Sequence, residues 1–168
     1  MAPDFARYIG VDVSPEMVRQ AAEFGIPHAE FHAVSGGDLS GVESESADFV
    51  YSFAVFQHVP DKAAIFNYFS ETGRVLRPGG IFRLHMKGLW SLPVGRWMIE
   101  AGVTENSRRE KKRHVKLPFV RLRYLDTWQG RAIRPGEAVE KCASLGLEVI
   151  EIEDAWTTMM WVGGRKRG

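Results

Sequence analysis

Cysteine is almost absent from this sequence, since Cys142 is the only one among 168 residues. A lone thiol cannot form a disulfide within the chain, which favours a protein of the reducing cytoplasm. Long apolar runs are missing as well, because none reaches the roughly 18 residues that a membrane-spanning helix needs. The first residues do not combine a basic segment with an apolar stretch, so we predict no secretory signal.

An excess of charge of one sign is also missing. The chain has 22 Lys and Arg residues against 21 Asp and Glu residues, a formal net charge of +1, so its overall charge favours neither nucleic acid nor a membrane surface. Hydrophobic residues make up 45% of the chain, as in ordinary soluble proteins. We therefore predict one domain over residues 1–168, with an insertion or cap at about 87–133.

Apolar runs and helix signals alternate along the chain and predict an α/β protein. Expected strands are 8–13, 29–34, 47–55, 81–86, 147–152 and 157–162, and expected helices are 15–24, 62–76 and 135–145. Such alternation predicts a mostly parallel sheet, with the last two strands as antiparallel neighbours. The continuous apolar run 47–55 predicts a strand buried on both faces, and Val139 and Cys142 are expected on the buried face of the last helix.

Ligands of parallel α/β sheets bind outside the carboxyl ends of the strands. Asp12 stands at such an end, directly after an apolar run. A carboxylate there has two oxygens that can accept both hydroxyls of a ribose, and it can equally support the turn into the next helix. The residue alone leaves these two interpretations open.

The string Gly10–Met17 (GVDVSPEM) resembles the segment after the first helix of class I S-adenosylmethionine-dependent methyltransferases. By that resemblance Asp12 binds the ribose and Val13 lies against the adenine. Met17 either flanks the adenine ring or belongs to the helix core.

A second similarity lies at Gly37-Asp38-Leu39. Members of the family carry a Gly-Asp pair after the third strand, where the carboxylate accepts the adenine amino group and the next backbone N–H reaches a ring nitrogen. The resemblance therefore implies these roles for Asp38 and Leu39. Taken alone, Asp38 is equally a turn residue beside glycines.

A third similarity is the string 52–59 (SFAVFQHV), which in the family runs beneath the cofactor. It implies that Ser52 allows close approach of the backbone and that Phe53 or Phe56 faces the sulfonium, with core packing as the alternative role for at least one of the two. His58 is the best candidate for a general base, with a structural role as the alternative. The string 75–80 (VLRPGG) is typical of the turn before the fifth strand and has a structural role.

The family's glycine-rich loop, Gly-x-Gly-x-Gly after the first strand, has no counterpart in this sequence. The resemblance therefore implies a Rossmann-like sheet that lacks its first strand and most of its first helix, as in an N-terminally truncated domain. That strand lies between those at Ile9 and Val50, so two inner edges lose a partner, which favours rearrangement or an oligomer formed through the edges. We expect such a chain to bind S-adenosylmethionine poorly.

The similarity points to a small-molecule methyl acceptor under an aromatic cap, with Trp90, Trp97 and Trp128 as its candidate lining. The basic stretch 108–123 is best explained as a solvated surface, with nucleic-acid binding as the alternative. His85 lies inside an expected strand and is interpreted as structural, or as facing the acceptor. No metal ligand set is expected.

Two other functions fit parts of the sequence. A nicotinamide-dependent oxidoreductase also places an acid at the end of its second strand. A degenerate methyltransferase domain that acts only as a scaffold would lack the glycine-rich loop.

Overall fold

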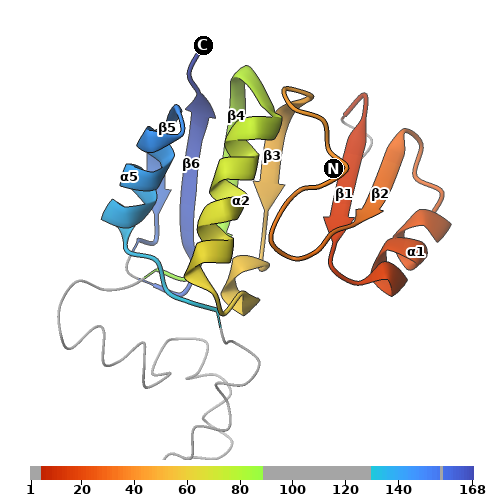
Figure 1. The fold of residues 1–168 in the computed structure, drawn as a ribbon, viewed down its shortest axis with the longest axis horizontal. Helices are drawn as coiled ribbons and strands as arrows, with labels where there is room; N and C mark the ends of the chain where they lie inside the picture. Colours follow the sequence, from red (N-terminus) through yellow and green to blue (C-terminus); the bar gives the residue numbers. More distant parts are fainter. Residues whose placement is uncertain (1–4, 89–129, 156) are drawn as a thin grey trace, which may run out of the picture.

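The computed structural model describes residues 5–88, 130–155 and 157–168 (Figure 1). Its elements, in chain order, are β1 (Tyr8–Asp12), α1 (Pro15–Glu23), β2 (Ala29–Ala33), β3 (Ala47–Ser52), the short 3-10 helix η2 (Phe56–His58), α2 (Lys62–Val75), β4 (Leu76–Met86), α5 (Pro135–Ser144), β5 (Leu147–Glu153) and β6 (Met160–Lys166). The predicted α/β alternation is confirmed. The three tryptophans of the predicted cap and the basic stretch 108–123 lie outside the described residues.

Two sheets are present in the described part of the chain (Figure 1). β1 and β2 form a parallel pair, and the second sheet has the order β3-β4-β6-β5. In it β3 and β4 are parallel, while β6 is antiparallel to both β4 and β5, which confirms the predicted hairpin at the end of the chain. Within the described residues β1 pairs only with β2, and β3 pairs only with β4.

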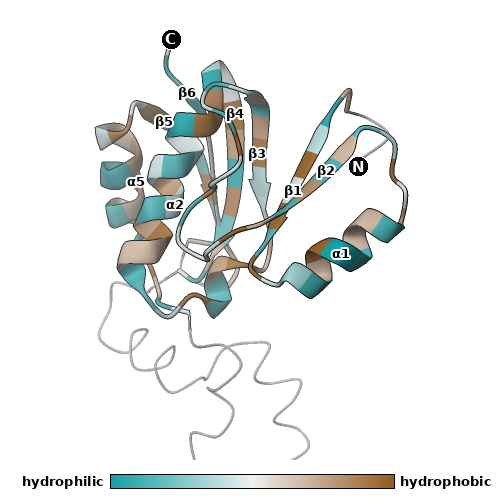
Figure 2. Cartoon of the chain, turned by 45° about the vertical axis from the view of Figure 1, so that its right-hand side comes forward, coloured by the Kyte–Doolittle hydropathy of each residue, from teal (hydrophilic) through white to brown (hydrophobic). Residues whose placement is uncertain are grey.

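Helix α1 begins and ends where local chemistry requires. The Ser14 hydroxyl accepts a hydrogen bond from the Met17 N–H at 3.3 Å, and Pro15 occupies the first turn, where its missing N–H costs nothing. Beyond the last helical turn Gly25 has a φ of +60°, a conformation that glycine adopts without steric cost. None of the residues of α1 is buried, and of its apolar residues Val18 and Ala21 are half-buried whereas Met17 and Ala22 are exposed (Figure 2).

The turn between α2 and β4 is built into the edge of the sheet. Ala47 pairs with Leu76, and the ladder resumes only at the pair Phe49–Ile81, so the intervening residues of β4 bulge out. Gly79 within this bulge has a φ of +80°. The turn predicted at residues 75–80 is therefore present. It lies as a bulge within β4, which begins at Leu76 and not, as expected, at Ile81.

The hydrophobic core lies between the four-stranded sheet and the helices α2 and α5, which cover the same face (Figure 1). Ile65 and Phe69 of α2 are completely buried, as the helix pattern predicts. In α5 the buried residues are Ala138 and Cys142. Val139 is 40% exposed, so its predicted burial is wrong, because the helix turns its 138/142 side to the core.

The opposite face of this sheet is partly open. Tyr51 and Phe53 are 41% and 51% exposed, so the prediction that 47–55 is buried on both faces is wrong. The reason is that among the described residues both helices that pack on the sheet lie on its other face. Tyr51 and Phe53 instead stack on Trp161 of β6, at centroid distances of 5.9 and 5.5 Å.

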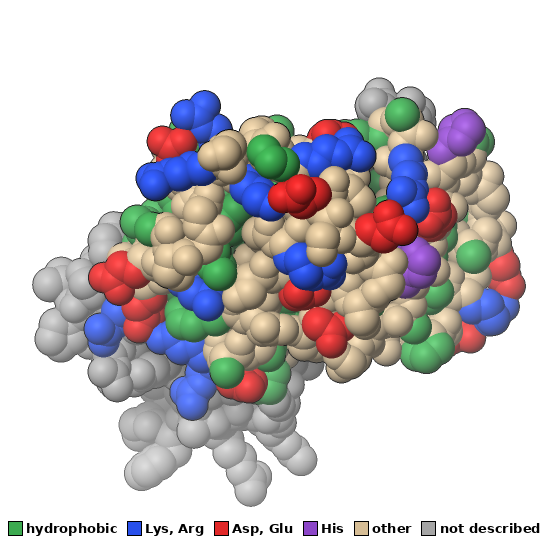
Figure 3. Space-filling view, turned by 45° about the horizontal axis from the view of Figure 1, so that its top comes forward, with side chains coloured by type: hydrophobic (Ala, Val, Ile, Leu, Met, Phe, Trp, Pro, Cys, Tyr) green, Lys and Arg blue, Asp and Glu red, His purple; other side chains and the backbone are tan. Residues whose placement is uncertain are grey.

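Charges of both signs are interspersed over the face shown in Figure 3. Among the described ion pairs, Arg74–Glu71 lies within helix α2, whereas Lys166–Glu45 joins segments that are distant in the sequence. Within the described residues, no helix has the length and apolar character to cross a membrane.

Candidate functional site

Asp12 is the last residue of β1 and is exposed at the carboxyl end of that strand. Its Oδ1 accepts the Ser14 N–H at 2.8 Å, and its backbone carbonyl accepts the Val34 N–H at 3.0 Å. The other carboxylate oxygen has no hydrogen-bond partner in the described part of the chain. Asp12 thus supports the turn into α1, as one interpretation held, and keeps an oxygen for a ligand, as the other requires.

Val13 and Met17 stand next to this carboxylate and expose their apolar side chains, by 61% and 52%. A β-carbon placed on Gly36 would lie 3.2 Å from Cγ1 of Val13, so the loop after β2 approaches Val13 closely. Gly36 has a φ of +91°, which favours glycine at this position. Because Met17 is exposed, the alternative in which it belongs to a helix core is not realised among the described residues.

Asp38 lies on the loop after β2 and is held by two neighbours. Its Oδ1 accepts the Ser40 N–H and its Oδ2 accepts the Ser35 hydroxyl, both at 3.0 Å. The hydrogen bond from the Ser40 backbone, followed by bonds from the Ser40 and Ser35 side chains, lowers the pKa of Asp38. The carboxylate is therefore charged at neutral pH.

Tyr68 of α2 shows that the two carboxylates share one side of the molecule. Burial raises the pKa of this phenol, and the negative charges of Asp38 and Asp12 raise it further. Both acids are therefore close enough to one hydroxyl to repel its ionised form. The sequence contains no signal for this role of Tyr68, which depends on contacts between segments far apart in the chain.

The loop that carries Asp38 is fixed to α2 by two further residues. Glu71 Oε2 accepts the Leu39 N–H at 3.0 Å, and Arg74 binds Glu71 at 2.8 Å. Arg74 also donates to the carbonyls of Leu39 and Val42, at 3.2 and 2.8 Å. The N–H of Leu39 thus has an acceptor within the protein, and contact of that N–H with an adenine requires the Glu71 carboxylate to move.

The carboxyl end of β3 carries the remaining cofactor candidates. Ser52 is half-buried, and Phe53 stacks on Trp161 with the two rings 5° from parallel. His58 ends η2 as an exposed residue, with a ring nitrogen 3.1 Å from Nε2 of Gln57. Ser52 ends β3, and Phe53 and His58 follow it in the chain, as predicted.

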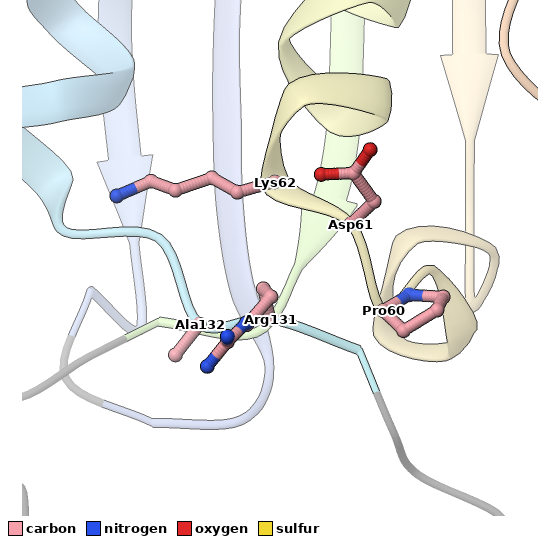
Figure 4. A pocket seen from close by; sticks show the side chains of 5 residues that line it. All are labelled: Pro60, Asp61, Lys62, Arg131 and Ala132. Carbon is pink, nitrogen blue, oxygen red and sulfur yellow. The ribbon is translucent and has the colours of Figure 1, made fainter.

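A pocket of about 500 Å³ lies at the start of α2, directly after the segment that carries His58 (Figure 4). It is lined by Pro60, Asp61, Lys62, Arg131 and Ala132, none of which is a predicted cofactor residue. Asp61 accepts the Ala63 N–H at 2.9 Å as the N-cap of α2, and Lys62 pairs with Glu137 of α5 at 2.7 Å. Because the side chains of Asp61 and Lys62 are engaged in these structural contacts, we assign no catalytic role to the pocket. Among the described residues no group of three His, Cys, Asp or Glu side chains is arranged to hold a metal ion.

Comparison with known protein families identifies the family of this chain. Residues 1–84, half of the chain, match the family model described as a methyltransferase domain. The chain belongs to the S-adenosylmethionine-dependent methyltransferases. The resemblance to this family is thereby confirmed, and S-adenosylmethionine is the cofactor of the family.

Among named relatives, this methyltransferase is 34% identical over 96 residues to trans-aconitate 2-methyltransferase of Azoarcus sp. (strain BH72). The match spans 56% of this chain and only 35% of that protein, so the chain corresponds to about a third of its length.

Solved structures share the fold. The YcgJ protein of Bacillus subtilis superposes with a TM-score of 0.66 at 17% identity, over 99% of this methyltransferase and 85% of that protein. The 1,6-didemethyltoxoflavin-N1-methyltransferase of Burkholderia thailandensis, solved with 1,6-didemethyltoxoflavin and S-adenosylhomocysteine, has a TM-score of 0.58 at 16% identity, over 96% of this chain and 62% of that one. These likenesses confirm the Rossmann-like α/β fold.

Proposed function

We propose that this methyltransferase transfers the methyl group of S-adenosylmethionine to a small-molecule acceptor, with the adenosyl part of the cofactor held between Asp12 and Asp38. The observation that carries the proposal is that β1 and β2 are parallel neighbours, so that Asp12 at the end of β1 and the loop of Asp38 after β2 lie at one edge, where Gly36 approaches Val13. The positions of two acids at neighbouring strand ends, one with an oxygen still available, suit the sugar and the base of one nucleoside.

The residues near Asp12 and Asp38 fit such a group. Asp12 offers its second oxygen to the ribose hydroxyls, while the exposed side chains of Val13 and Met17 supply apolar surface for a purine. Asp38 offers a charged acceptor to an amino group. The N–H of Leu39 would reach a ring nitrogen of the adenine once the Glu71 carboxylate releases it. Bound S-adenosylmethionine supplies an electrophilic methyl group on a sulfonium.

The carboxyl end of β3 would then face the methionine half of the cofactor. Ser52 brings the backbone close, and Phe53 presents an aromatic ring that attracts a cation. His58 is proposed to accept a proton from the acceptor, where the acceptor must lose one, from its position just beyond β3. The protein's main contribution would be the alignment of acceptor and cofactor.

Small-molecule acceptors are favoured by the relatives. The Azoarcus protein is named for trans-aconitate, and the Burkholderia structure contains 1,6-didemethyltoxoflavin. The balanced net charge of +1 supports the same choice over nucleic acid.

The experiment is a titration of the chain with S-adenosylhomocysteine in which binding is monitored by protein NMR. This method measures affinities as weak as millimolar. We expect Asp12→Asn to weaken binding by about 10-fold or more, because a charge-assisted contact to the ribose is lost. Asn keeps an oxygen for the Ser14 N–H, so the turn into α1 is preserved. Asp38→Asn should weaken binding similarly.

The matched control is Asp48→Asn. Asp48 is exposed, pairs with Arg77 at 2.8 Å and lies outside the proposed site. The affinity of the Asp48→Asn variant for S-adenosylhomocysteine should therefore equal that of the unaltered chain. Equal affinity of the Asp12 variant and this control would contradict the proposal. Tighter binding of NADH than of S-adenosylhomocysteine would support the oxidoreductase alternative, and binding of neither would contradict the proposed cofactor site.

A further inference from the structure

His85 lies near the end of β4 and is completely buried. Its ring contacts the rings of Phe53 and Trp161, each at a centroid distance of 5.1 Å. Its Nδ1 accepts the backbone N–H of Ala54 at 3.1 Å. A nitrogen that accepts carries no hydrogen, so the hydrogen of the neutral ring is on Nε2.

Burial lowers the pKa of His85, and the ring is neutral at physiological pH. Nε2 is itself buried and has no hydrogen-bond partner in the described part of the chain. The bond to Ala54 is therefore the one polar interaction that the described structure gives this imidazole. A ring kept only for packing needs no nitrogen at that place, since a leucine or phenylalanine fills the space without an unpaired polar atom.

Ala54 is the residue that depends on this bond. Its φ is +60°, in the left-handed region that non-glycine residues rarely adopt. Such a conformation persists only where the surroundings hold it. Ala54 comes two residues after Ser52, the last residue of β3, and directly after Phe53, so its backbone direction determines how this strand ends.

We infer that His85 is a positioning residue that holds the Ala54 amide through Nδ1 and thereby fixes the carboxyl end of β3, where Ser52 and Phe53 are proposed to face the cofactor. Its effect on ligand affinity rests on the proposed function, whereas its effect on Ala54 does not. His85 acts through the backbone of another residue and is not a catalytic group.

Three substitutions separate this role from simple packing. His85→Asn places an acceptor oxygen near the position of Nδ1, His85→Gln places its amide one bond further along, near Nε2, and His85→Leu removes both. We expect protection of the Ala54 amide against hydrogen exchange to fall about 10-fold or more in the Leu and Gln variants, as loss of one hydrogen bond implies. The Asn variant should keep protection within about threefold of the unaltered chain.

A double variant tests whether the backbone of Ala54 is what His85 controls. Glycine adopts a positive φ without steric cost, so Ala54→Gly should restore most of the stability that His85→Leu removes. S-adenosylhomocysteine affinity should follow the same order, with the Asn and the double variant close to the unaltered chain and the Leu variant about 10-fold weaker.

Two results would overturn the inference. One is equal Ala54 protection in the Leu and Asn variants, and the other is a nitrogen NMR spectrum of the unaltered chain in which Nδ1 of His85, rather than Nε2, carries the hydrogen. The second measurement needs no variant and decides the matter even where a substitution unfolds the chain. If no form of the chain binds S-adenosylhomocysteine but the exchange order holds, the proposed function fails and the role of His85 stands.

Discussion

Gly164 of β6 lies directly beneath the ring of Phe82, its ladder partner in β4. A β-carbon at 164 would stand 2.8 Å from Cζ of Phe82 and 2.1 Å from the backbone carbonyl oxygen of Glu148. The carbonyl belongs to β5 and cannot move without disturbing the ladder. We predict that Gly164→Ala lowers the free energy of unfolding by roughly 2–3 kcal/mol, as overpacking of a core does.

Gly136 of α5 provides the matched control. It has no heavy atom within 4 Å of an added β-carbon, and alanine suits a helix better than glycine. Gly136→Ala should leave the free energy of unfolding unchanged or raise it by up to about 1 kcal/mol. Urea denaturation of both variants measures the difference, and equal midpoints would contradict the close packing at Gly164.

Arg74 is predicted to hold the loop that carries Asp38. Its guanidinium pairs with Glu71 and donates to the carbonyls of Leu39 and Val42, so Arg74→Met leaves several acceptors without a donor. We expect a loss of about 1–2 kcal/mol of stability. Hydrogen exchange should become faster at the amides of 39–42, which reports the loop directly.

Arg77→Met serves as its control. Arg77 pairs with Asp48, and these side chains are 51% and 81% exposed, so solvent screens the pair. The variant should change stability by less than about 0.5 kcal/mol and leave exchange at 39–42 unchanged. A loop that is as well protected in the Arg74 variant as in this one would refute the assignment.

Features set by neighbouring residues were predictable from the sequence. Ser14, Pro15 and Gly25 define α1 through caps and turn preferences that act within a few residues, and the helix expected over 15–24 is present as Pro15–Glu23. Asp12 was predicted from its place at a strand end, since parallel strands bring their carboxyl ends to one edge. This position alone left a ribose ligand and a turn residue as open interpretations, and the resemblance of residues 10–17 to the family implied the ribose role.

Features that need long-range contacts were not predictable in the same way. The Glu71 carboxylate accepts a hydrogen bond from the N–H of Leu39, which is 32 residues away in the sequence. Nothing near Glu71 in the sequence distinguishes it from a surface acid. His85 was assigned a structural role or one facing the acceptor, but its partner Ala54 depends on the pairing of β3 with β4. The residue's identity was visible in the sequence, whereas its contact was not.

The face of α5 illustrates a third limit, because periodicity alone does not fix which side of a helix meets the core. Val139 was expected to be buried and is 40% exposed, whereas Ile65 of α2 is completely buried. We predict that Ile65→Ala costs about 2–5 kcal/mol, through lost burial and a cavity. Val139→Ala should cost less than about 0.5 kcal/mol. Comparable losses in thermal unfolding would show that the buried side of α5 is misassigned.

Alkaline pH should weaken the fold through Cys142. The side chain is completely buried, and desolvation raises the pKa of its thiol from 9.0 to about 12. Above pH 9 the thiol of the unfolded chain loses its proton while that of the folded chain keeps it. The unfolded state is therefore favoured as the pH rises from 9 towards 12, by up to about 1.4 kcal/mol for each pH unit.

Comparison with Cys142→Ala isolates this effect. The variant has a constant cavity cost at every pH but no thiol to ionise, while the other alkaline groups, including the buried Tyr68, are common to both proteins. Between pH 8 and pH 10.5, under reducing conditions, the unaltered chain should lose about 1–2 kcal/mol more stability than the variant. Parallel pH profiles of the two proteins would mean that the thiol ionises as easily in the folded chain as in the unfolded one, and that Cys142 is not enclosed between α5 and the sheet.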